Sequence, residues 1–573
     1  MEAVRYSIGL ADRPGHRFHV QVHLPDGVSE VVFPSWAPGS YLMREFSRFA
    51  RDIHAHRGGA AVPVLRVSRN RWQVSGPCLL EYTVYGRDKT VRTAFLDENL
   101  AFFLPSNLCV FAPGQGQSVL TVDVPAGHCA VCPVAATVNG PAVATFEFPD
   151  LDTLMDSPVS VGPFEVDRFD AIGVSHEHYI EPGHNGDRSK MTADLARIVT
   201  AAAGIITQSF PYDHYQFVTL HAKNGHGGLE HKSCSILLRP RLGFADEHGY
   251  EEFLTLAAHE HFHAWNVKRV HPVELGPRFD YASEHYTRDL WWLEGGTVYY
   301  EERIAFLAGA VSKERHLARL ADLVARLRNI PGRRHQSLED GSFDAWIKLY
   351  RPNEDLGNST VSYYLKGAVV VMCLDLELRH RSRGHYGSDD VLRTLWARWG
   401  ARGVGYPTGA IEAVCAELAG AGDWPRWFAA HVRGTDETEV ESALDHAGCD
   451  LVVVPGKAGG WLGVELSGMS VTSVREDGPS AAALSPGDEL MAIDQERVEA
   501  STLGERLRVL GPNRDLRLLV ARDGRIVERT LRSGSFPAAE LKIVERTATD
   551  AEREQVRTTW LSRAAPCAVE PGA

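Results

Sequence analysis

Alternating hydrophobic and polar positions characterise the first part of the chain. Apolar side chains alternate with histidine and glutamine over residues 18–24, and residues 80–85 and 119–124 show the same period of two. This period is typical of strands that bury one face. Turns containing proline and glycine separate these short segments. The pattern therefore favours an N-terminal β-sandwich domain over residues 1–166.

The pattern becomes mainly helical over residues 167–450. One further strand is expected over residues 216–221, followed by a glycine-rich turn over residues 224–228. Beyond this turn, long apolar-periodic runs such as residues 253–264 and 362–378 indicate helices. We therefore expect a mostly helical second domain.

A third segment, residues 455–535, returns to short strands. Residues 470–474 and 491–494 are expected to be strands, and residues 503–510 a helix. The remaining residues, 536–573, are charged and carry few structural signals, so we expect a C-terminal tail. A chain of 573 residues is also too long for one hydrophobic core. The fold class is therefore multidomain α+β.

Composition narrows the function without identifying it. Apolar residues make up 44% of the chain and the formal net charge is −14, which disfavours nonspecific contact with nucleic acid or an anionic membrane. No apolar stretch reaches the length of a membrane span, and the N-terminus has no pattern of a secretory leader. We expect a cytoplasmic protein whose nine scattered cysteines are mostly reduced thiols.

One short motif carries the chemistry. His259, Glu260 and His263 form HExxH within an apolar run that is expected to be helical. Histidines four residues apart share one face of a helix, so both imidazoles can bind one zinc ion. Glu260 lies next to them, where it can take a proton from a water on the metal. His261 falls on the opposite side of the helix and is expected to pack or hydrogen-bond.

A catalytic zinc requires a third protein ligand. The best candidate is Glu294, about 30 residues after His263, because it stands in an aromatic run before two glycines. Glu274 and Glu284 are the competing carboxylates. They lie in a loop-like stretch, where carboxylates are usually solvated.

The motifs resemble those of a known family. Residues 259–269, His-Glu-His-Phe-His-Ala-Trp-Asn-Val-Lys-Arg, are similar to the HExxHxWNVKR signature of glycyl aminopeptidases that carry a PDZ domain. Residues 36–46, Trp-Ala-Pro-Gly-Ser-Tyr-Leu-Met-Arg-Glu-Phe, resemble the N-terminal hallmark of that family. The resemblance covers nearly the whole chain. It implies a gluzincin related to the aminopeptidase N group, with a β-sandwich, a thermolysin-like catalytic domain and a PDZ domain.

The resemblance also suggests how a substrate amine is recognised. The Gly-Gly-Leu-Glu-His stretch that begins at Gly227 and Gly228 resembles the GxMEN exopeptidase motif. Glu230 would then hold the free N-terminal ammonium, since a carboxylate near the metal distinguishes an amine from an internal amide by charge. Leu229 and His231 stand where the related enzymes have Met and Asn.

The same resemblance implies two further roles. Glu294 matches the Trp-x-x-Glu-Gly signature and becomes the third zinc ligand. Tyr364 matches a Tyr-x-Lys-Gly element and would donate a hydrogen bond to the developing oxyanion. Tyr363 remains the alternative, because a one-residue shift in register exchanges them. Thr297, one helical turn after Glu294, is a further candidate for supporting the ligands.

These expectations define a zinc-dependent aminopeptidase that acts on peptides with a free N-terminus. Only the resemblance implies a preference for Gly or Ala. Its PDZ domain, with a carboxylate-binding loop near residues 461–464, would either take a C-terminal peptide or protein or pack on the catalytic domain. The alternatives are an endopeptidase that recruits proteins through the PDZ domain, and a noncatalytic peptide-binding scaffold.

Overall fold

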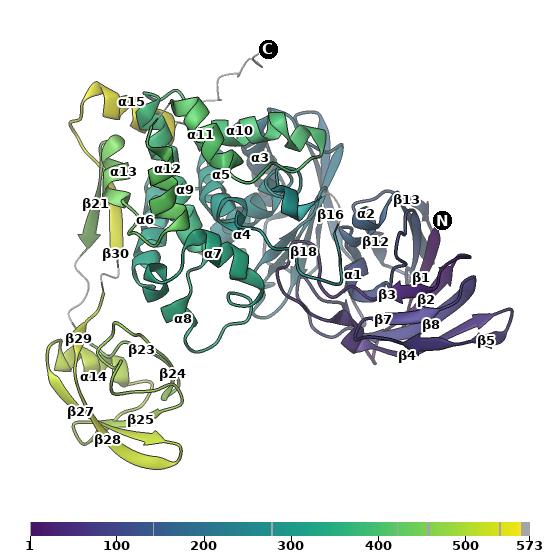
Figure 1. Cartoon of the computed structure of the whole chain (residues 1–573), viewed down its shortest axis with the longest axis horizontal. Coiled ribbons are helices and arrows are strands. Elements are labelled where there is room, and N and C mark those ends of the chain that lie inside the picture. The colour runs from purple at the N-terminus through teal and green to yellow at the C-terminus, as the bar shows by residue number, and fades with distance from the viewer. Residues whose placement is uncertain are drawn as a thin grey trace.

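The computed structural model shows a β-rich N-terminal domain, a helical middle domain and a small C-terminal domain (Figure 1). It describes residues 2–140, 142–276, 279–420, 422–454, 459–537 and 540–562. No helix within these ranges is both long and apolar enough to cross a membrane.

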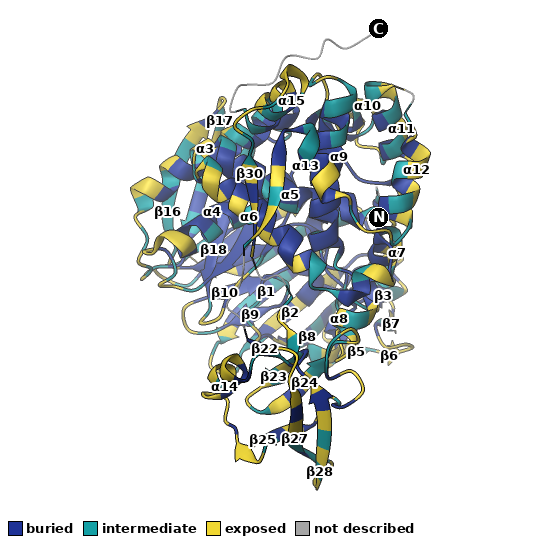
Figure 2. Ribbon diagram, turned by 90° about the vertical axis from the view of Figure 1, so that its left-hand side faces the viewer, coloured by how far each residue is buried: buried dark blue, intermediate teal, exposed yellow. Residues whose placement is uncertain are grey.

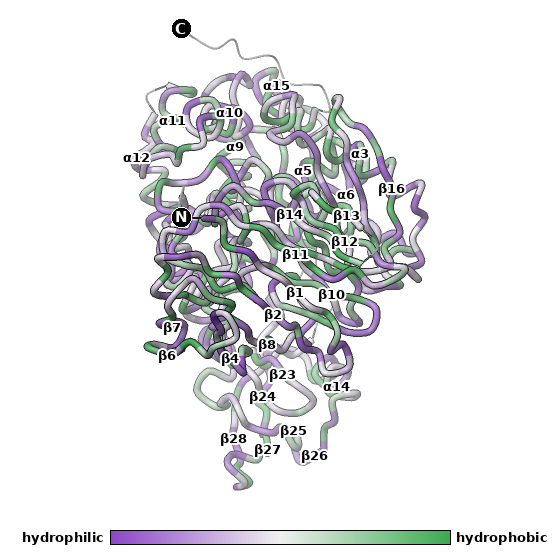
Figure 3. Tube along the Cα trace, turned by 90° about the vertical axis from the view of Figure 1, so that its right-hand side faces the viewer, coloured by the Kyte–Doolittle hydropathy of each residue, from purple (hydrophilic) through white to green (hydrophobic). Residues whose placement is uncertain are grey.

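An eight-stranded sheet is the frame of the N-terminal domain. In spatial order its strands are β13 (Ala136–Asn139), β14 (Val143–Phe148), β11 (Ser118–Asp123), β1 (Val4–Asp12), β2 (Arg17–Leu24), β8 (Cys78–Tyr85), β4 (Ala50–Arg57) and β5 (Ala60–Val62). The expected alternation is confirmed in β2, where Val20 and Val22 are buried while His19 and Gln21 are exposed. Figure 3 faces this side of the molecule and shows hydrophobic and hydrophilic positions mixed along β1 and β2.

Two smaller sheets complete this domain. One contains β12 (Cys129–Val131), β15 (Val159–Gly162), β10 (Ala101–Phe103) and β9 (Phe95–Leu96), and the other β3 (Glu30–Val32), β7 (Arg71–Val74) and β6 (Val64–Arg66).

A five-stranded sheet opens the second domain and positions the glycine-rich turn. Its order is β16 (Glu165–Ala171), β17 (Val174–Ile180), β18 (His214–His221), β20 (Cys234–Arg239) and β19 (Gly228–Glu230). The short edge strand β19 runs antiparallel to β20. It packs against helix α4 (Glu247–Phe262), as does β20. The sheet therefore brings residues 228–230 to the helix that carries the HExxH motif.

Three helical segments surround the same place, and the middle one of them packs against the other two. These are α4, α5 (Gly296–Leu307) and α9 (Tyr363–Arg381), with a π-helical turn η3 (Trp291–Gly295) directly before α5. Gly295 and Gly367 allow η3 to lie on α9: a Cβ at Gly295 would come within 2.4 Å of the Tyr363 carbonyl oxygen. Backbone contact this close is open only to glycine. Figure 2 shows α9 largely buried.

The C-terminal domain has a hydrophobic core of its own. Its main sheet runs β23 (Val464–Ser467), β24 (Ser470–Val474), β25 (Glu489–Ile493), β27 (Asp515–Arg522) and β28 (Arg525–Arg532), with β26 (Glu496–Arg497) beside β25. Helix α14 (Leu503–Leu510) matches the expected helix. The polar face of α14 is exposed (Figure 2).

Residues 540–561, which we expected to be part of a tail, return instead to the helical domain. Strand β30 (Glu540–Glu545) pairs with β21 (Cys449–Val454), and helix α15 (Ala551–Leu561) packs on α9. Trp560 is 1% exposed, and its indole N–H donates to the hydroxyl of Tyr299 at 3.0 Å. Charged residues dominate this stretch, so its few buried anchors give only a weak sequence signal.

Candidate metal centre

His259, His263 and Glu294 meet at one point in the helical domain. The first two come from α4 and the residue that caps it, and Glu294 comes from η3. Oε2 of Glu294 lies 3.7 Å from Nε2 of His259 and 3.3 Å from Nε2 of His263. All three side chains are buried, and their ligand atoms lie within 4.8 Å of one another. Two imidazole nitrogens and one carboxylate oxygen are a donor set that suits zinc.

The other nitrogen of each imidazole ring is also occupied. Nδ1 of His263 lies 2.6 Å from the carbonyl oxygen of Asn266. A carbonyl only accepts, so this nitrogen must donate, which leaves the lone pair of a neutral ring on Nε2. Nδ1 of His259 lies 2.5 Å from Oε2 of Glu301. Both rings are therefore oriented for a metal on their Nε2 side.

Glu301 was not anticipated from the sequence. It lies two helical turns after Glu294, and that spacing is the only signal that could have singled it out. Thr297, expected to support the ligands, accepts a hydrogen bond from Asn266 at 3.2 Å. It therefore acts on His263 through Asn266.

The charges at this centre favour an ionised Glu294. Burial would raise the pKa of Glu294, but the adjacent imidazoles of His263 and His259 hold it well below its usual value. A carboxylate that stays ionised in a buried site is suited to a cation. The residues therefore fit the zinc ion that the HExxH motif implies.

Glu260 lies beside the two histidines but contributes no atom to that group. Burial raises the pKa of Glu260 to about 7, against the lowering effect of the two histidines. A carboxylate with this pKa can both accept and return a proton near neutral pH. The adjacent strand depends on glycine: a Cβ at Gly228 would come within 2.3 Å of Oε1 of Glu260. Gly227 has φ 117°, which also favours glycine.

Glu230 ends strand β19 and is only 4% exposed. Ligand atoms of Glu230, Glu260 and His263 lie within 4.8 Å of one another. Oε1 of Glu230 has no hydrogen-bond partner within the described part of the chain. The N-terminal loop that carries Gly39 packs on it directly, since a Cβ at Gly39 would come within 2.6 Å of that oxygen. The N-terminal domain thus closes one side of the site.

The two adjacent tyrosines lie in different environments. Tyr364 lines a cleft of about 760 Å³ together with His259 and Glu260. Its hydroxyl lies 3.0 Å from that of Tyr350. Tyr363 is fully buried and stacks on the ring of Tyr364 at 4.7 Å between centroids. Only Tyr364 of the two lines this cleft.

Arg92 is a second residue that the sequence did not single out. It comes from the N-terminal domain, lines the same cleft, and donates to the carbonyl oxygen of Gly228 at 3.1 Å. It therefore anchors β19 where this strand passes Glu260.

The remaining histidine and acidic candidates lie elsewhere. Nε2 of His261 lies 2.5 Å from the hydroxyl of Tyr212 within an aromatic cluster, in keeping with the packing role expected for it. Glu274 accepts a hydrogen bond from Thr408 at 3.2 Å. Neither Glu274 nor Glu284 belongs to a metal-ligating group among the described residues.

Comparisons with known proteins identify the family. The M61 glycyl aminopeptidase model matches residues 252–370, and the Peptidase M61 N-terminal domain model matches residues 5–163. A crystal structure of an aminopeptidase N family protein from Idiomarina loihiensis superposes with a TM-score of 0.91 at 28% identity, covering 98% of this chain and 100% of that one. No curated protein gives a significant match.

More distant structures resemble part of the chain. The M1 zinc metallopeptidase from Deinococcus radiodurans gives a TM-score of 0.49 at 17% identity over 76% of this chain and 94% of that one. The fold and the site together define a zinc metallo-aminopeptidase. Over residues 5–163 and 252–370 the chain matches the M61 glycyl aminopeptidase family.

Proposed function

We propose that this aminopeptidase releases one small residue, Gly or Ala, from the free N-terminus of a peptide. The observation that carries the proposal is the buried carboxylate of Glu230. Its Oε1 has no partner within the described residues, and the side chain lies in one group with Glu260 and His263. A peptide ammonium would supply the missing partner. A fixed negative charge this close to the metal position leaves room for one residue before the bond to be cut.

We assign His259, His263 and Glu294 as the ligands of one catalytic zinc. When bound, zinc activates a water and polarises the carbonyl of the scissile bond. Glu260 accepts the proton that the attacking water loses and later returns it to the leaving amine. Its pKa of about 7 suits both transfers.

Tyr364 is the proposed donor to the oxygen on which charge develops. Tyr364 lines the cleft that also contains Glu260, and its hydroxyl lies 3.0 Å from that of Tyr350. A pre-positioned donor stabilises that charge without reorganising as the reaction proceeds. Gly227 and Gly228 bring the backbone of β19 close to an extended substrate.

The size of the released residue depends on the space beside Glu230. Gly39 lies directly against Glu230, where a Cβ would come within 2.6 Å of Oε1, so the N-terminal loop limits the space on that side of the carboxylate. A separate cavity of about 510 Å³ also reaches Glu230 and is lined by aromatic side chains, among them Trp36, Tyr281 and Trp346. That cavity supports a second candidate, an aminopeptidase for large apolar residues.

We infer that the C-terminal domain, residues 455–535, is a PDZ domain that follows domains at 1–166 and 167–450. Strand β23 is an edge of its sheet, where a C-terminal peptide can add as a further strand. The domain also contacts the helical domain. The Asn358 amide donates to the carbonyl oxygen of Val474 at 2.9 Å and accepts from the N–H of Glu476 at 3.0 Å.

Hydrolysis of a panel of aminoacyl amides tests the proposal. We expect chelator-sensitive release of Gly and Ala, slower release of Phe and Tyr, and no cleavage of the N-acetylated forms. Fastest release of Phe would favour the second candidate. Equal cleavage of acetylated peptides would favour a PDZ-recruited endopeptidase and refute the role of Glu230.

A further inference from the structure

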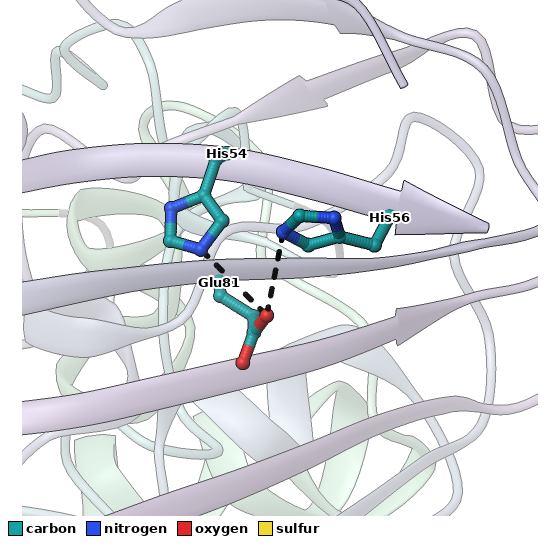
Figure 4. Close-up of side chains that lie close together, drawn as sticks. All are labelled: His54, His56 and Glu81. Atoms are coloured by element: carbon teal, nitrogen blue, oxygen red, sulfur yellow. Dashed lines mark ion pairs between the residues drawn. The ribbon is translucent and has the colours of Figure 1, made fainter. Parts of the chain in front are cut away.

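A second group of metal-ligating side chains lies on the eight-stranded sheet of the N-terminal domain. His54 and His56 alternate along β4, so both face the same side of the sheet, and Glu81 on β8 pairs directly with His54. Figure 4 shows the two imidazoles converging on the Glu81 carboxylate. Figure 1 places β4 and β8 well apart from α4 and α5, which carry the catalytic centre.

The spacing of this group is close to that of the catalytic centre. Oε2 of Glu81 lies 3.7 Å from Nε2 of His54 and 4.0 Å from Nε2 of His56. The corresponding separations at Glu294 are 3.7 and 3.3 Å. Ligand atoms about 2.1 Å from a tetrahedral zinc lie roughly 3.4 Å apart. Small rotations of exposed side chains would therefore close the second group around an ion.

The surrounding contacts orient these side chains as ligands. Nδ1 of His54 lies 2.7 Å from the carbonyl oxygen of Asp52, so it must donate there and leave the lone pair of a neutral ring on Nε2. The Gln21 amide donates to Oε1 of Glu81 at 2.8 Å and leaves Oε2 facing the histidines. Both contacts resemble those that support established metal ligands.

A β-bulge brings the Asp52 carbonyl to this position. The pairing of β4 with β8 shifts register between Arg51 and His54, and Asp52 adopts φ 55°. Aspartate in this conformation is uncommon. Bulges often redirect side chains beside functional sites. The bulge therefore places the Asp52 carbonyl where it orients the imidazole of His54.

An ordinary surface ion pair explains the arrangement less well. No Lys or Arg pairs with Glu81 within the described ranges, so its carboxylate lacks a permanently charged partner there, and exposed ion pairs contribute little stability. One divalent cation would bind all three groups at once. A groove of about 410 Å³ adjoins His54 and Glu81, leaving further coordination positions open to water or a partner's side chain.

We propose that His54, His56 and Glu81 bind a second divalent transition-metal ion, separate from the catalytic zinc. The donor set of two imidazoles and a carboxylate suits Zn²⁺. The partial exposure of the histidines makes this an exchangeable surface site.

Zinc titration of the full-length protein tests this proposal. Metal-free protein is titrated with ZnCl2 by calorimetry, and the bound zinc is counted by mass spectrometry after gel filtration. We expect two zinc ions per chain in the wild type. The double variant His54→Gln/His56→Gln should hold one and keep the chelator-sensitive hydrolysis unchanged. Gln21→Ala should weaken the second site about tenfold.

His128→Gln is the matched control. His128 is a partly exposed histidine of the same domain, and its ring nitrogens contact the backbone carbonyls of Ala126 and Asn99. It should retain both ions. Glu294→Gln should lose the catalytic ion and keep the second, which separates failure of one site from failure of the other. One zinc per chain in the wild type, or a second zinc that persists in the double variant, would overturn the proposal.

Discussion

Oε2 of Glu301 contacts Nδ1 of His259 at 2.5 Å, while Nε2 of the same ring faces Glu294. One continuous helical segment, η3 followed by α5, therefore supplies both a proposed zinc ligand and the group that orients another. Carboxylate partners of this kind fix the tautomer of a ligating histidine and increase its basicity.

We expect Glu301→Gln to weaken zinc binding about 10- to 100-fold. Competition with a chromophoric chelator measures this change. Asp322→Asn, in the same cleft and paired with Arg326, should leave the zinc affinity unchanged. Equal affinities for wild type and Glu301→Gln would show that the contact does not support the metal.

Replacing Glu260 tests proton transfer independently of metal binding. Glu260→Gln keeps the shape of the side chain but cannot accept a proton. We expect kcat to fall about 10³-fold, within the range for lost acid–base catalysis, while the zinc content stays at the wild-type value. Undiminished hydrolysis in a zinc-loaded Glu260→Gln protein would refute the proposed mechanism.

The two neighbouring tyrosines provide a built-in comparison. Tyr364→Phe removes the hydroxyl proposed to donate to the developing oxyanion, so kcat should fall about 10²- to 10³-fold with little change in KM. Tyr363→Phe alters a buried ring outside this cleft and should retain nearly full kcat. Steady-state kinetics on alanine amide distinguishes them, and the reverse ranking would assign the role to Tyr363.

Glu230→Gln removes the charge proposed to hold the substrate amine. We expect kcat/KM for glycine amide to fall at least tenfold, because a charge-assisted hydrogen bond of about 1.5–3 kcal/mol is lost. Cleavage of the N-acetylated substrate should stay negligible or rise. The two substrates are compared in parallel assays, and an unchanged kcat/KM for the free amine would contradict the assignment.

Acid should weaken the contact between the first two domains at Asp156. Burial would raise the pKa of Asp156, but the Lys268 ammonium, 2.7 Å away, outweighs it and holds the pKa well below its usual value. The folded state therefore binds this proton less readily than the unfolded state. The resulting stability is present above the unfolded pKa of about 4 and is lost as the pH falls towards the folded value.

Asp156→Asn should accordingly lower the free energy of unfolding by about 3 kcal/mol at pH 7. The difference from wild type should shrink below pH of about 4, where the carboxylate of the unfolded wild-type chain takes up a proton that the folded state still excludes. Denaturant unfolding at several pH values measures this difference in the free energy of unfolding. Asp26→Asn, at an exposed position of the same domain, serves as the control. A pH-independent difference would indicate a packing effect alone.

Local periodicity is enough to predict that the two histidines of the metal centre lie side by side. His259 and His263 share a helix face because the backbone hydrogen bonds of a helix set its period. The strand β2 and the helix α14 also follow from short-range patterns. Each of these elements is encoded by residues that are neighbours in sequence.

Tertiary packing determines which other side chains surround the metal centre. Glu294 reaches the histidines because Gly295 and Gly367 let η3 lie against α9. Glu301 and Arg92 face the cleft only once α5 and the N-terminal domain are in place. Apart from the spacing of Glu301 from Glu294, no local pattern distinguishes these two residues from ordinary surface residues, since their roles depend on contacts between distant segments.

The proposed second metal site can likewise be predicted from the sequence only in part. The alternation of His54 and His56 places both on one face of a strand, and the sequence by itself determines that much. The position of Glu81 opposite His54 depends on the register between β4 and β8, including the bulge at Asp52. Side-chain period is a local property of the chain, whereas register is set by the packing of the whole sheet.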